Sequence, residues 1–253
     1  MEGEDPRASA LSPSSIFDPR SSGRFAVIFD FDGLIVDSET PDFEVHRQIF
    51  AEHGVTLTVE EWLEEVGSYQ PDRNWFERLG RRIGRDLDQV ALREEKRRRF
   101  WQVVIMEPMP GIRRLLDELS AATVPLALAS SSELSWIGRA TTMLDVARYF
   151  RTIVTGNDVT RRKPDPEPYL LAAQRLGLPP ACCVAIEDSE HGLVAARAAG
   201  MKTVVIPNWL TAMQDLSAAD LRVPSAGELN VEKLARLAGN GVSGTACRRV
   251  KTL

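Results

Sequence analysis

Two aspartates separated by one residue follow a short apolar run near the start of the sequence. The run Phe25–Phe29 leads directly into Asp30, Phe31, Asp32 and Gly33. Side chains two positions apart on a strand point to the same side, so both carboxylates are predicted at the carboxyl end of a buried strand, where open α/β sheets bind ligands. Two close carboxylates repel each other, which indicates either a bound divalent cation or a shared proton. A solvated turn is the alternative interpretation.

A serine run and an isolated lysine are candidates for binding an anion. Ser130 and Ser131 follow the apolar run 126–129, at the predicted end of another strand. Hydroxyl and backbone N–H groups in this position can bind phosphate oxygens, although serine is also a common helix N-cap. Lys163 precedes a proline in a chain with few lysines, and its ammonium is a compact positive charge suited to a phosphoryl group. A solvated basic loop is the alternative for Lys163.

A second pair of acids, Glu187 and Asp188, directly follows the apolar run 182–186. Carboxylates in this position can complete an all-oxygen magnesium shell, and an acidic helix N-terminus is the alternative. Each of the four motifs is ambiguous when taken singly. Together they place an acid pair, a hydroxyl, a lysine and a second acid pair at strand ends, which predicts that they converge on one site.

These motifs require strands whose carboxyl ends share one edge of a sheet. Short apolar runs recur along the chain, separated by helix-like stretches long enough for a crossover. The runs expected as strands are Phe25–Phe29, Val124–Ala129, Thr152–Val154, Cys182–Ile186 and Thr203–Ile206. Their alternation with helices predicts an α/β fold with a Rossmann-like parallel sheet core and helices on both faces.

A helical insertion interrupts this alternation. Between residues 41 and 107 aromatic and aliphatic side chains recur at helical spacing, and proline-containing segments flank the region. We therefore expect an inserted α-helical cap domain, preceded by a disordered N-terminal extension rich in Ser and Pro. The expected division is 1–23 for the extension, 24–40 and 108–225 for the core domain, 41–107 for the cap domain, and 226–253 for a C-terminal helix and frayed tail.

Composition argues against several classes of partner. The net charge is −5 and the sequence has no long basic stripe, so no nucleic-acid partner is expected. No apolar run approaches the roughly 18 residues of a membrane span. Cys182, Cys183 and Cys247 match neither a disulfide framework nor a zinc site, which predicts a reducing, cytoplasmic location. The expected partner is a small phosphorylated metabolite, and the expected state is a monomer or weak dimer.

The chain resembles the haloacid dehalogenase-like superfamily, in the helical-cap branch that includes phosphatases and beta-phosphoglucomutase. The resemblance covers about residues 24–207. The motifs that support it are, in order, Phe29-Asp-Phe-Asp-Gly-Leu-Ile-Val-Asp-Ser38, Ser130, Lys163-Pro164, and Glu187-Asp188-Ser189 followed by Gly192. This combination is specific for the superfamily and uninformative about the substrate.

The resemblance implies a magnesium-dependent phosphatase that hydrolyses small phosphate monoesters, such as sugar or polyol phosphates. Asp30 would attack phosphorus and form an aspartyl-phosphate intermediate. Asp32 would protonate the leaving alkoxide and then deprotonate the water that hydrolyses the intermediate. Mg²⁺ is the one cofactor implied. The implied Mg²⁺ ligands are Asp30, the backbone carbonyl of Asp32 and Asp188, with Glu187 close by, and the implied phosphate-binding residues are Ser130, Ser131 and Lys163.

A sugar-phosphate mutase and a non-catalytic binding module are the alternatives. In beta-phosphoglucomutase a cap histidine stands where this chain has Asp42, and a substrate-clamping arginine stands where it has Tyr69 and Gln70. These departures favour net hydrolysis, although Arg73 lies nearby in the sequence. Glu39 and Asp42 are further candidates for contact with substrate. A binding module would be expected to lack some of the acids, and here all are present.

Several other conspicuous residues are expected to have structural roles. His46, His53 and His191 are expected to pack or to lie at the surface. Trp62, Trp75 and Trp101 are expected in the core of the cap, with stacking on a substrate as the alternative. Lys96, in a run of charged residues, is expected on a solvated helix face.

Overall fold

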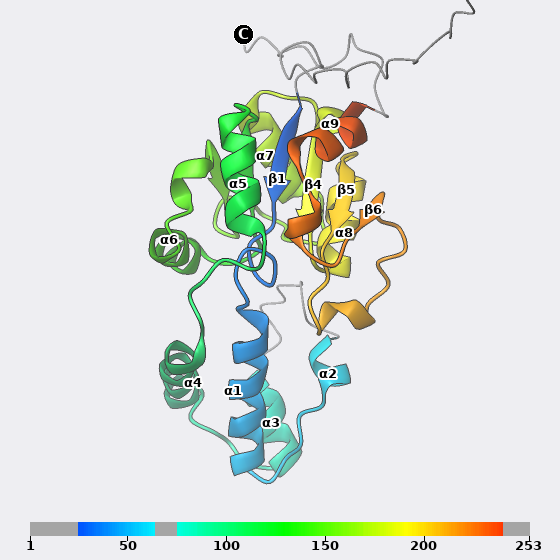
Figure 1. Ribbon diagram of the computed structural model, residues 1–253. Coiled ribbons are helices and arrows are strands. Elements are labelled where there is room, and N and C mark those ends of the chain that lie inside the picture. Colours follow the sequence, from blue (N-terminus) through cyan, green and yellow to red (C-terminus); the bar gives the residue numbers. More distant parts are fainter. Residues whose placement is uncertain (1–24, 64–74, 240–253) are drawn as a thin grey trace, which may run out of the picture.

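A six-stranded parallel sheet forms the centre of the computed structural model (Figure 1), which describes residues 25–63 and 75–239. The strand order is β3-β2-β1-β4-β5-β6. The strands are β1 Ala26–Phe29, β2 Leu126–Ala129, β3 Thr152–Val154, β4 Cys183–Glu187, β5 Lys202–Val205 and β6 Leu221–Arg222. This architecture confirms the predicted α/β fold. The two-residue strand β6 is not among the predicted strands, because Leu221 and Arg222 do not form an apolar run that could be recognised in the sequence.

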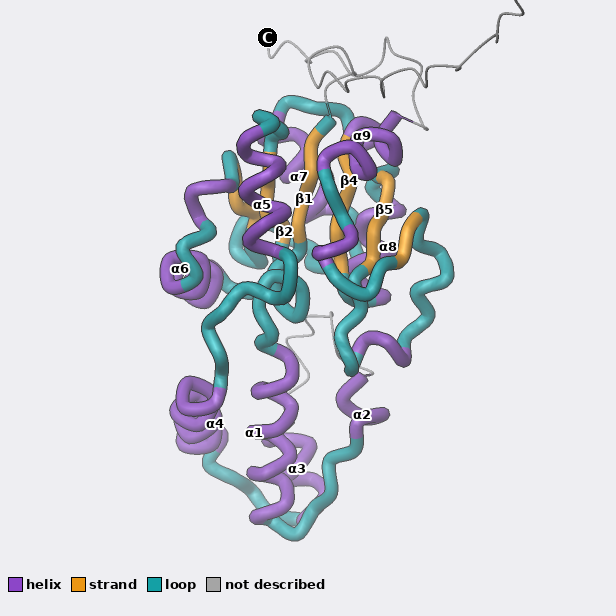
Figure 2. The backbone as a smooth tube through the Cα atoms, viewed as in Figure 1, coloured by secondary structure: helices purple, strands orange, loops and turns teal. Residues whose placement is uncertain are grey.

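Helices cover both faces of this sheet (Figure 2). Val27 and Phe29 of β1 pack in a cluster with α5, α6 and α9, whereas Ala26 and Ile28 pack with α7 and α8. The bounds are α5 Ile112–Ala121, α6 Leu134–Met143, α7 Glu167–Leu176, α8 Glu190–Ala198 and α9 Val231–Gly239. Successive strand residues point to opposite faces, so a strand covered on both sides must be apolar throughout. The continuous apolar runs therefore identify the central strands.

Among the residues described between β1 and α5, four helices form a helical unit beyond the carboxyl edge of the sheet (Figure 1). They are α1 Glu39–Glu52, α2 Val59–Leu63, α3 Trp75–Ile83 and α4 Gln89–Val103. The helical unit has its own apolar cluster, in which Trp62 and Trp75 stack with ring centroids 5.0 Å apart. His46 stacks on Phe76 at 5.4 Å, in agreement with its expected packing role. The helical unit therefore has a core separate from the clusters on the sheet.

The C-terminal helix and two cysteines bear on the remaining expectations. Helix α9 provides the expected C-terminal helix, while the predicted N-terminal extension and residues 240–253 lie outside the described residues. Cys183 is a buried free thiol, but Cys182 is disulfide-bonded. This corrects the expectation that the cysteines form no disulfide, and they no longer argue for a reducing compartment. Among the described helices, none combines the length and apolarity needed to cross a membrane.

Candidate active site

The predicted acids meet at the carboxyl ends of the two central strands. Asp30 follows β1, and its backbone N–H donates to the carbonyl of Ile186 in β4 at 2.9 Å. This parallel register places Asp30 beside Glu187 and Asp188. One carboxylate oxygen from each of the three acids lies within 4.8 Å of the other two, and all three residues are buried. The structure thus brings together acids that are more than 150 positions apart in the sequence.

Lys163 lies inside this acidic cluster. It comes from the loop between β3 and α7 and is only 3% exposed. Its Nζ donates to Asp30 Oδ1 and, at 2.5 Å, to Glu187 Oε1. Tyr169, a fully buried residue of α7, also donates its hydroxyl to Glu187 Oε1, and its ring lies 4.8 Å from Nζ. The alternative of a solvated loop at Lys163 is therefore excluded, and the lysine is a buried counter-charge at the predicted site.

The charges of the cluster do not balance. Burial raises the pKa of Asp30 to about 8 against the opposing effect of Lys163, with Glu187 adding to the rise. Burial also raises the pKa of Asp188 well above its usual range, and the charge of Asp30 adds to the effect. Burial opposes the positive charge of Lys163, but Asp30 and Glu187 outweigh it and raise the lysine pKa. One ammonium thus faces three carboxylates, an arrangement that favours an additional cation.

Asp32 is held by four side-chain donors. Ser38 Oγ donates to its Oδ1 at 2.7 Å and Trp136 Nε1 to the same oxygen at 2.7 Å. Ser132 Oγ donates to Oδ2 at 2.6 Å and Ser130 Oγ at 3.2 Å. The carboxylate is therefore fixed in one orientation at the carboxyl end of β1. No role was predicted for Ser132 and Trp136, since nothing local in the sequence relates them to Asp32.

Asp188 is oriented by a loop that follows β5. Asn208 Nδ2 donates to Asp188 Oδ2 at 2.9 Å and approaches the carbonyl of Gly33 at 3.4 Å. Gly33 has φ +76°, and a Cβ at this position would lie 2.4 Å from Asp188 Oδ2. A glycine is thus required both for the left-handed turn and for the close approach of the second acid pair. No role was predicted for Asn208, because nothing local in the sequence relates it to Asp188.

The helix after β4 is shaped around Glu187. The Glu187 Oε2 atom accepts from the backbone N–H of Asp188 at 3.2 Å and from Ser189 Oγ at 3.4 Å. Ser189 also caps α8, because its Oγ accepts from the backbone N–H of Gly192 at 3.3 Å. A Cβ on Gly192 would come within 2.0 Å of the Glu187 carboxylate. A glycine is required at position 192 because the carboxylate of Glu187 occupies the space that a side chain there would need.

The serine run lies between Asp32 and the lysine loop. Ser130 is buried, and its backbone N–H extends the pairing of β2 with β3 by donating to Val154 at 3.0 Å. Ser131 is half-buried and contacts the neighbouring loop through two groups. Its Oγ accepts from the backbone N–H of Lys163 at 3.3 Å, and its carbonyl accepts from Arg162 Nη1 at 2.7 Å. The predicted anion-binding residues thus lie together at one sheet edge.

The first helix of the helical unit brings further acids toward this edge. Glu39, in the first turn of α1, is half-buried, and burial together with the charges of Asp32 and Asp42 raises its pKa to about 8. Asp42 forms an ion pair with Lys96 of α4, in which the Lys96 side chain is 27% exposed. Lys96 therefore lies half-buried on a face of α4 and is paired with an acid of α1. Tyr69, Gln70 and Arg73, the candidate residues of the cap loop, lie outside the described residues.

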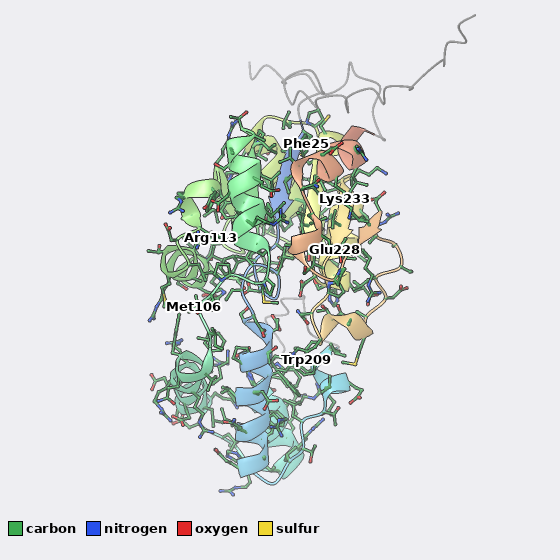
Figure 3. The ribbon with its side chains drawn as sticks, viewed as in Figure 1. Phe25, Met106, Arg113, Trp209, Glu228 and Lys233 are labelled. Atoms are coloured by element: carbon green, nitrogen blue, oxygen red, sulfur yellow. The ribbon has the colours of Figure 1, made fainter. Side chains whose placement is uncertain are left out.

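A loop after β5 joins the sheet to the helical unit. Trp209 Nε1 donates to Thr40 Oγ1 at 2.7 Å, and its ring lies 6.2 Å from Phe43 of α1. Figure 3 shows Trp209 where the loop meets the start of the helical unit. The next residue, Leu210, is fully buried in the apolar cluster of the helical unit. This contact was not predicted, because the sequence of the loop resembles an ordinary surface turn.

Comparisons with known proteins agree with this geometry. The model of the haloacid dehalogenase-like hydrolase family matches residues 27–206. The YhcW protein of Bacillus subtilis is 39% identical over 210 residues, which are 83% of this chain and 95% of that protein. The phosphorylated carbohydrates phosphatase of Thermotoga maritima is 33% identical over 183 residues, 71% of this chain and 83% of that one.

Solved structures share the fold. A mutant of CbbY from Rhodobacter sphaeroides in complex with xylulose-(1,5)bisphosphate superposes with a TM-score of 0.69 at 28% identity, covering 83% of this chain and 99% of that one. A beta-phosphoglucomutase from Clostridium difficile has a TM-score of 0.68 at 23% identity, with 86% and 98% coverage, and shows likeness of fold alone. From the family match, the sequence identities and the four converging motifs, we conclude that the chain belongs to the haloacid dehalogenase-like hydrolases.

Proposed function

We propose that the protein is a magnesium-dependent phosphatase that hydrolyses small phosphate monoesters, with sugar or polyol phosphates as the substrate class. The observation behind the proposal is the buried cluster of Asp30, Glu187 and Asp188 around Lys163, with Asp32 held beside it. The phosphorylated carbohydrates phosphatase among the relatives and the sugar bisphosphate bound to CbbY support the substrate class.

The donor set fits a magnesium ion. Carboxylate oxygens are hard ligands of the kind Mg²⁺ prefers, and a divalent charge would offset the excess of acids. Asp30, Asp188 and the backbone carbonyl of Asp32 would hold the ion. Both oxygens of Glu187 already accept hydrogen bonds from protein groups, so Glu187 would act close by or through water. When bound, the ion would supply positive charge to the phosphoryl oxygens.

The carboxylates divide the chemistry between them. Asp30 attacks phosphorus, so that a bond forms between its carboxylate oxygen and phosphorus while the bond to the ester oxygen breaks. Asp32 gives its proton to that departing oxygen, which leaves as an alcohol. Asp32 then takes a proton from water, and the resulting hydroxide attacks phosphorus and releases inorganic phosphate. The carboxylate of Asp30 and the proton on Asp32 are restored at the end of the cycle.

The neighbouring groups would bind the phosphoryl oxygens and exclude water. Lys163 presents an ammonium, and Ser130 and Ser131 present hydroxyls, at the sheet edge, where fixed positive potential stabilises the transition state. In this proposal residues 24–40 and 108–225 form the core domain, and residues 41–107, which contain the helical unit, form a cap that closes over the substrate. Substrate choice then depends on the side chains of the cap.

The test is phosphate release with and without magnesium. We would assay p-nitrophenyl phosphate and a panel of sugar and polyol phosphates, in MgCl₂ or in EDTA. Asp30→Asn should lower turnover by at least about a thousandfold, since it removes the nucleophile. The matched control is Asp117→Asn, an exposed aspartate of α5 away from the site. Undiminished turnover by Asp30→Asn, or equal turnover in EDTA, would contradict the proposal.

A sugar-phosphate mutase remains a second candidate function, because this chain and beta-phosphoglucomutase have the same fold. Asp42, which stands where the mutase has a cap histidine, forms an ion pair with Lys96 and offers a carboxylate in place of an imidazole. This favours net hydrolysis. If no ester releases phosphate, the next assay is the isomerisation of a sugar phosphate primed with a sugar bisphosphate. Absence of both activities in the folded protein would favour the non-catalytic binding module.

A further inference from the structure

The indole of Trp136 connects the proposed acid/base to the rest of the molecule. Trp136 lies in the first turn of α6, and its Nε1 donates to Asp32 Oδ1 at 2.7 Å. Two other donors to Asp32, Ser130 and Ser132, come from the segment just before α6. Three of the four donors thus belong to the short stretch 130–136, and of these three Trp136 is the one whose ring packs on α4. The fourth donor, Ser38, is the N-cap of α1.

The other side of the Trp136 ring packs on the end of α4. Its centroid lies 5.5 Å from that of Phe100 and 5.6 Å from that of Trp101, with the ring of Phe31 at 6.3 Å. The guanidinium of Arg139, one turn further along α6, lies 3.8 Å from the centroid of Trp101. Figure 1 shows α6 and α4 on the same side of the molecule. Trp101 therefore belongs to a contact between α4 and α6, and not only to the interior of the helical unit.

The geometry makes one ring responsible for two contacts. A shift of α4 relative to α6 would displace Phe100 and Trp101, and with them the ring whose N–H holds Asp32. A half-buried tryptophan needs a partner for its N–H, so packing alone could account for a hydrogen bond to some acceptor. Here the acceptor is the carboxylate that the proposed mechanism uses as acid and base. If Trp136 has only a structural role, its loss should affect all esters alike. If it positions Asp32, its loss should affect most the esters that need the proton of Asp32.

We propose that Trp136 is a positioning residue that aims the carboxyl group of Asp32 at the leaving oxygen and makes its aim depend on the placement of α4. This inference rests on the proposed phosphatase function. It predicts that loss of the indole N–H weakens the step in which Asp32 donates its proton. Esters with a poor leaving group, such as a sugar phosphate, depend strongly on that proton, whereas p-nitrophenolate leaves without it.

The test compares the two ester classes in Trp136→Phe, which keeps an aromatic ring against Phe100 but removes the donor. We expect kcat/KM for a sugar or alkyl phosphate to fall about ten- to hundredfold, and kcat/KM for p-nitrophenyl phosphate to fall less than about threefold. The ratio kcat/KM is used because it reports the steps up to phosphoryl transfer to Asp30. Thermal unfolding of each variant shows whether the fold is kept.

Two further variants separate the effect of the hydrogen bond to Asp32 from the effect of packing against the helical unit. Trp209→Phe removes the other indole contact with the helical unit, to Thr40, without touching Asp32, and should change both ester classes by the same factor. Trp101→Leu leaves Trp136 intact but removes its neighbour on α4, and should lower kcat/KM for the alkyl ester more than for the aryl ester.

A leaving-group-independent loss in folded Trp136→Phe, or no loss, would overturn the inference while leaving the phosphatase intact. A wild type that hydrolyses neither ester would overturn the proposed function itself. If Trp136→Phe does not fold, the indole N–H resonances of the wild type's five tryptophans provide the test. In Asp32→Asn the resonance of Trp136 should shift, and an unchanged spectrum would refute the hydrogen bond in solution.

Discussion

Lys163 shows how the meaning of a residue depends on its surroundings. In the sequence it is one lysine in a basic stretch, and in the structure it is buried between Asp30 and Glu187. Taking an ammonium and carboxylates out of water is costly, and the cost is recovered only while all of them are paired. Tyr169 adds a hydrogen bond to the same Glu187 oxygen, which keeps that carboxylate in place for the lysine.

Removal of this lysine should therefore destabilise the fold as well as abolish turnover. We expect Lys163→Met to lower the free energy of unfolding by about 3–5 kcal/mol, since Asp30 and Glu187 lose their counter-charge. Urea denaturation followed by circular dichroism measures the change. The double variant Lys163→Met with Glu187→Gln should recover part of the loss, because one of the unpaired charges is gone. Wild-type stability in Lys163→Met would mean that the folded state does not depend on the ammonium of Lys163 to balance Asp30 and Glu187.

Magnesium should stabilise the protein through the excess of acids at the site. A cation that binds only the folded state adds about 2.7 kcal/mol at a concentration of about 100 times its Kd. We expect a rise in the thermal midpoint of the wild type on addition of MgCl₂, reversed by EDTA, and a much smaller rise in Asp188→Asn. Calorimetric scans at several MgCl₂ concentrations measure both. Equal stabilisation of the two proteins would place the ion elsewhere.

At the scale of elements, the helices after the strands are fitted to the site in different ways. Helix α8 begins directly after the second acid pair, and its Gly192 leaves room for the carboxylate of Glu187. Helix α6 begins after the serine run and contributes Trp136 from its first turn. Gly138 of α6 is exposed and has nothing within 4 Å of the position of a Cβ. The two helices therefore contain one glycine under strong steric restraint and one under none.

This contrast predicts opposite effects of the same substitution. Gly192→Ala would force the buried carboxylate of Glu187 away from Lys163, so we expect it to lower the free energy of unfolding by about 1–3 kcal/mol and to lower turnover. Gly138→Ala should raise the free energy of unfolding by about 0.5–1 kcal/mol, because alanine is the better helix former. Chemical denaturation of the two variants side by side tests the prediction. Similar effects in both would show that Glu187 has room to move.

At the scale of the whole molecule, the helical unit has its own core and meets the rest of the chain through aromatic contacts. Trp136 packs on α4 from one direction, and Trp209 with Leu210 packs on α1 from another. Each contact comes from a loop or helix that also orients an acid, Asp32 through Trp136 and Asp188 through Asn208. Placement of the helical unit and placement of the acids are thus linked by direct contacts.

The core of the helical unit should respond to pH through His46. Burial lowers the pKa of His46 below 6.5, outweighing the nearby Asp42 carboxylate, and the charge of Lys96 adds to the lowering. A buried histidine of lowered pKa contributes its full stability above the unfolded-state pKa, and the contribution is lost as the pH falls through the folded-state pKa. We therefore expect His46 to contribute a loss of stability as the pH falls from about 7 to about 5, and the buried acids of raised pKa, Asp30, Glu39 and Asp188, to oppose it.

The matched variants identify the histidine responsible. His46→Phe keeps the stacking on Phe76 and removes the titrating group, so its thermal midpoint relative to the wild type should rise as the pH falls, measured by differential scanning calorimetry. His53→Gln, a change at the half-buried C-cap of α1, is the matched control. An identical pH profile in His46→Phe and wild type would mean that His46 does not titrate in this range.

The amino-acid sequence by itself determined the sheet and the residues at its edge. Strands buried on both faces must be continuously apolar, so Ala26–Phe29 and Cys183–Glu187 stand out locally, and the polar residues that end them can be read directly. Because parallel strands end at one edge, the convergence of Asp30, Ser130 and Asp188 follows from the strands alone. The helical pattern of 41–107 likewise predicted an insertion, since helical periodicity is a local property.

Only the tertiary structure decided which groups orient the acids. Trp136 and Asn208 reach Asp32 and Asp188 through contacts that depend on how helices and loops pack on the sheet, 104 and 20 residues away in the sequence. The burial of Lys163 and the pairing of Lys96 with Asp42 are of the same kind. Periodicity and strand ends are set by neighbouring residues and can be read from the chain. A hydrogen bond between distant residues exists only after packing has brought them within reach.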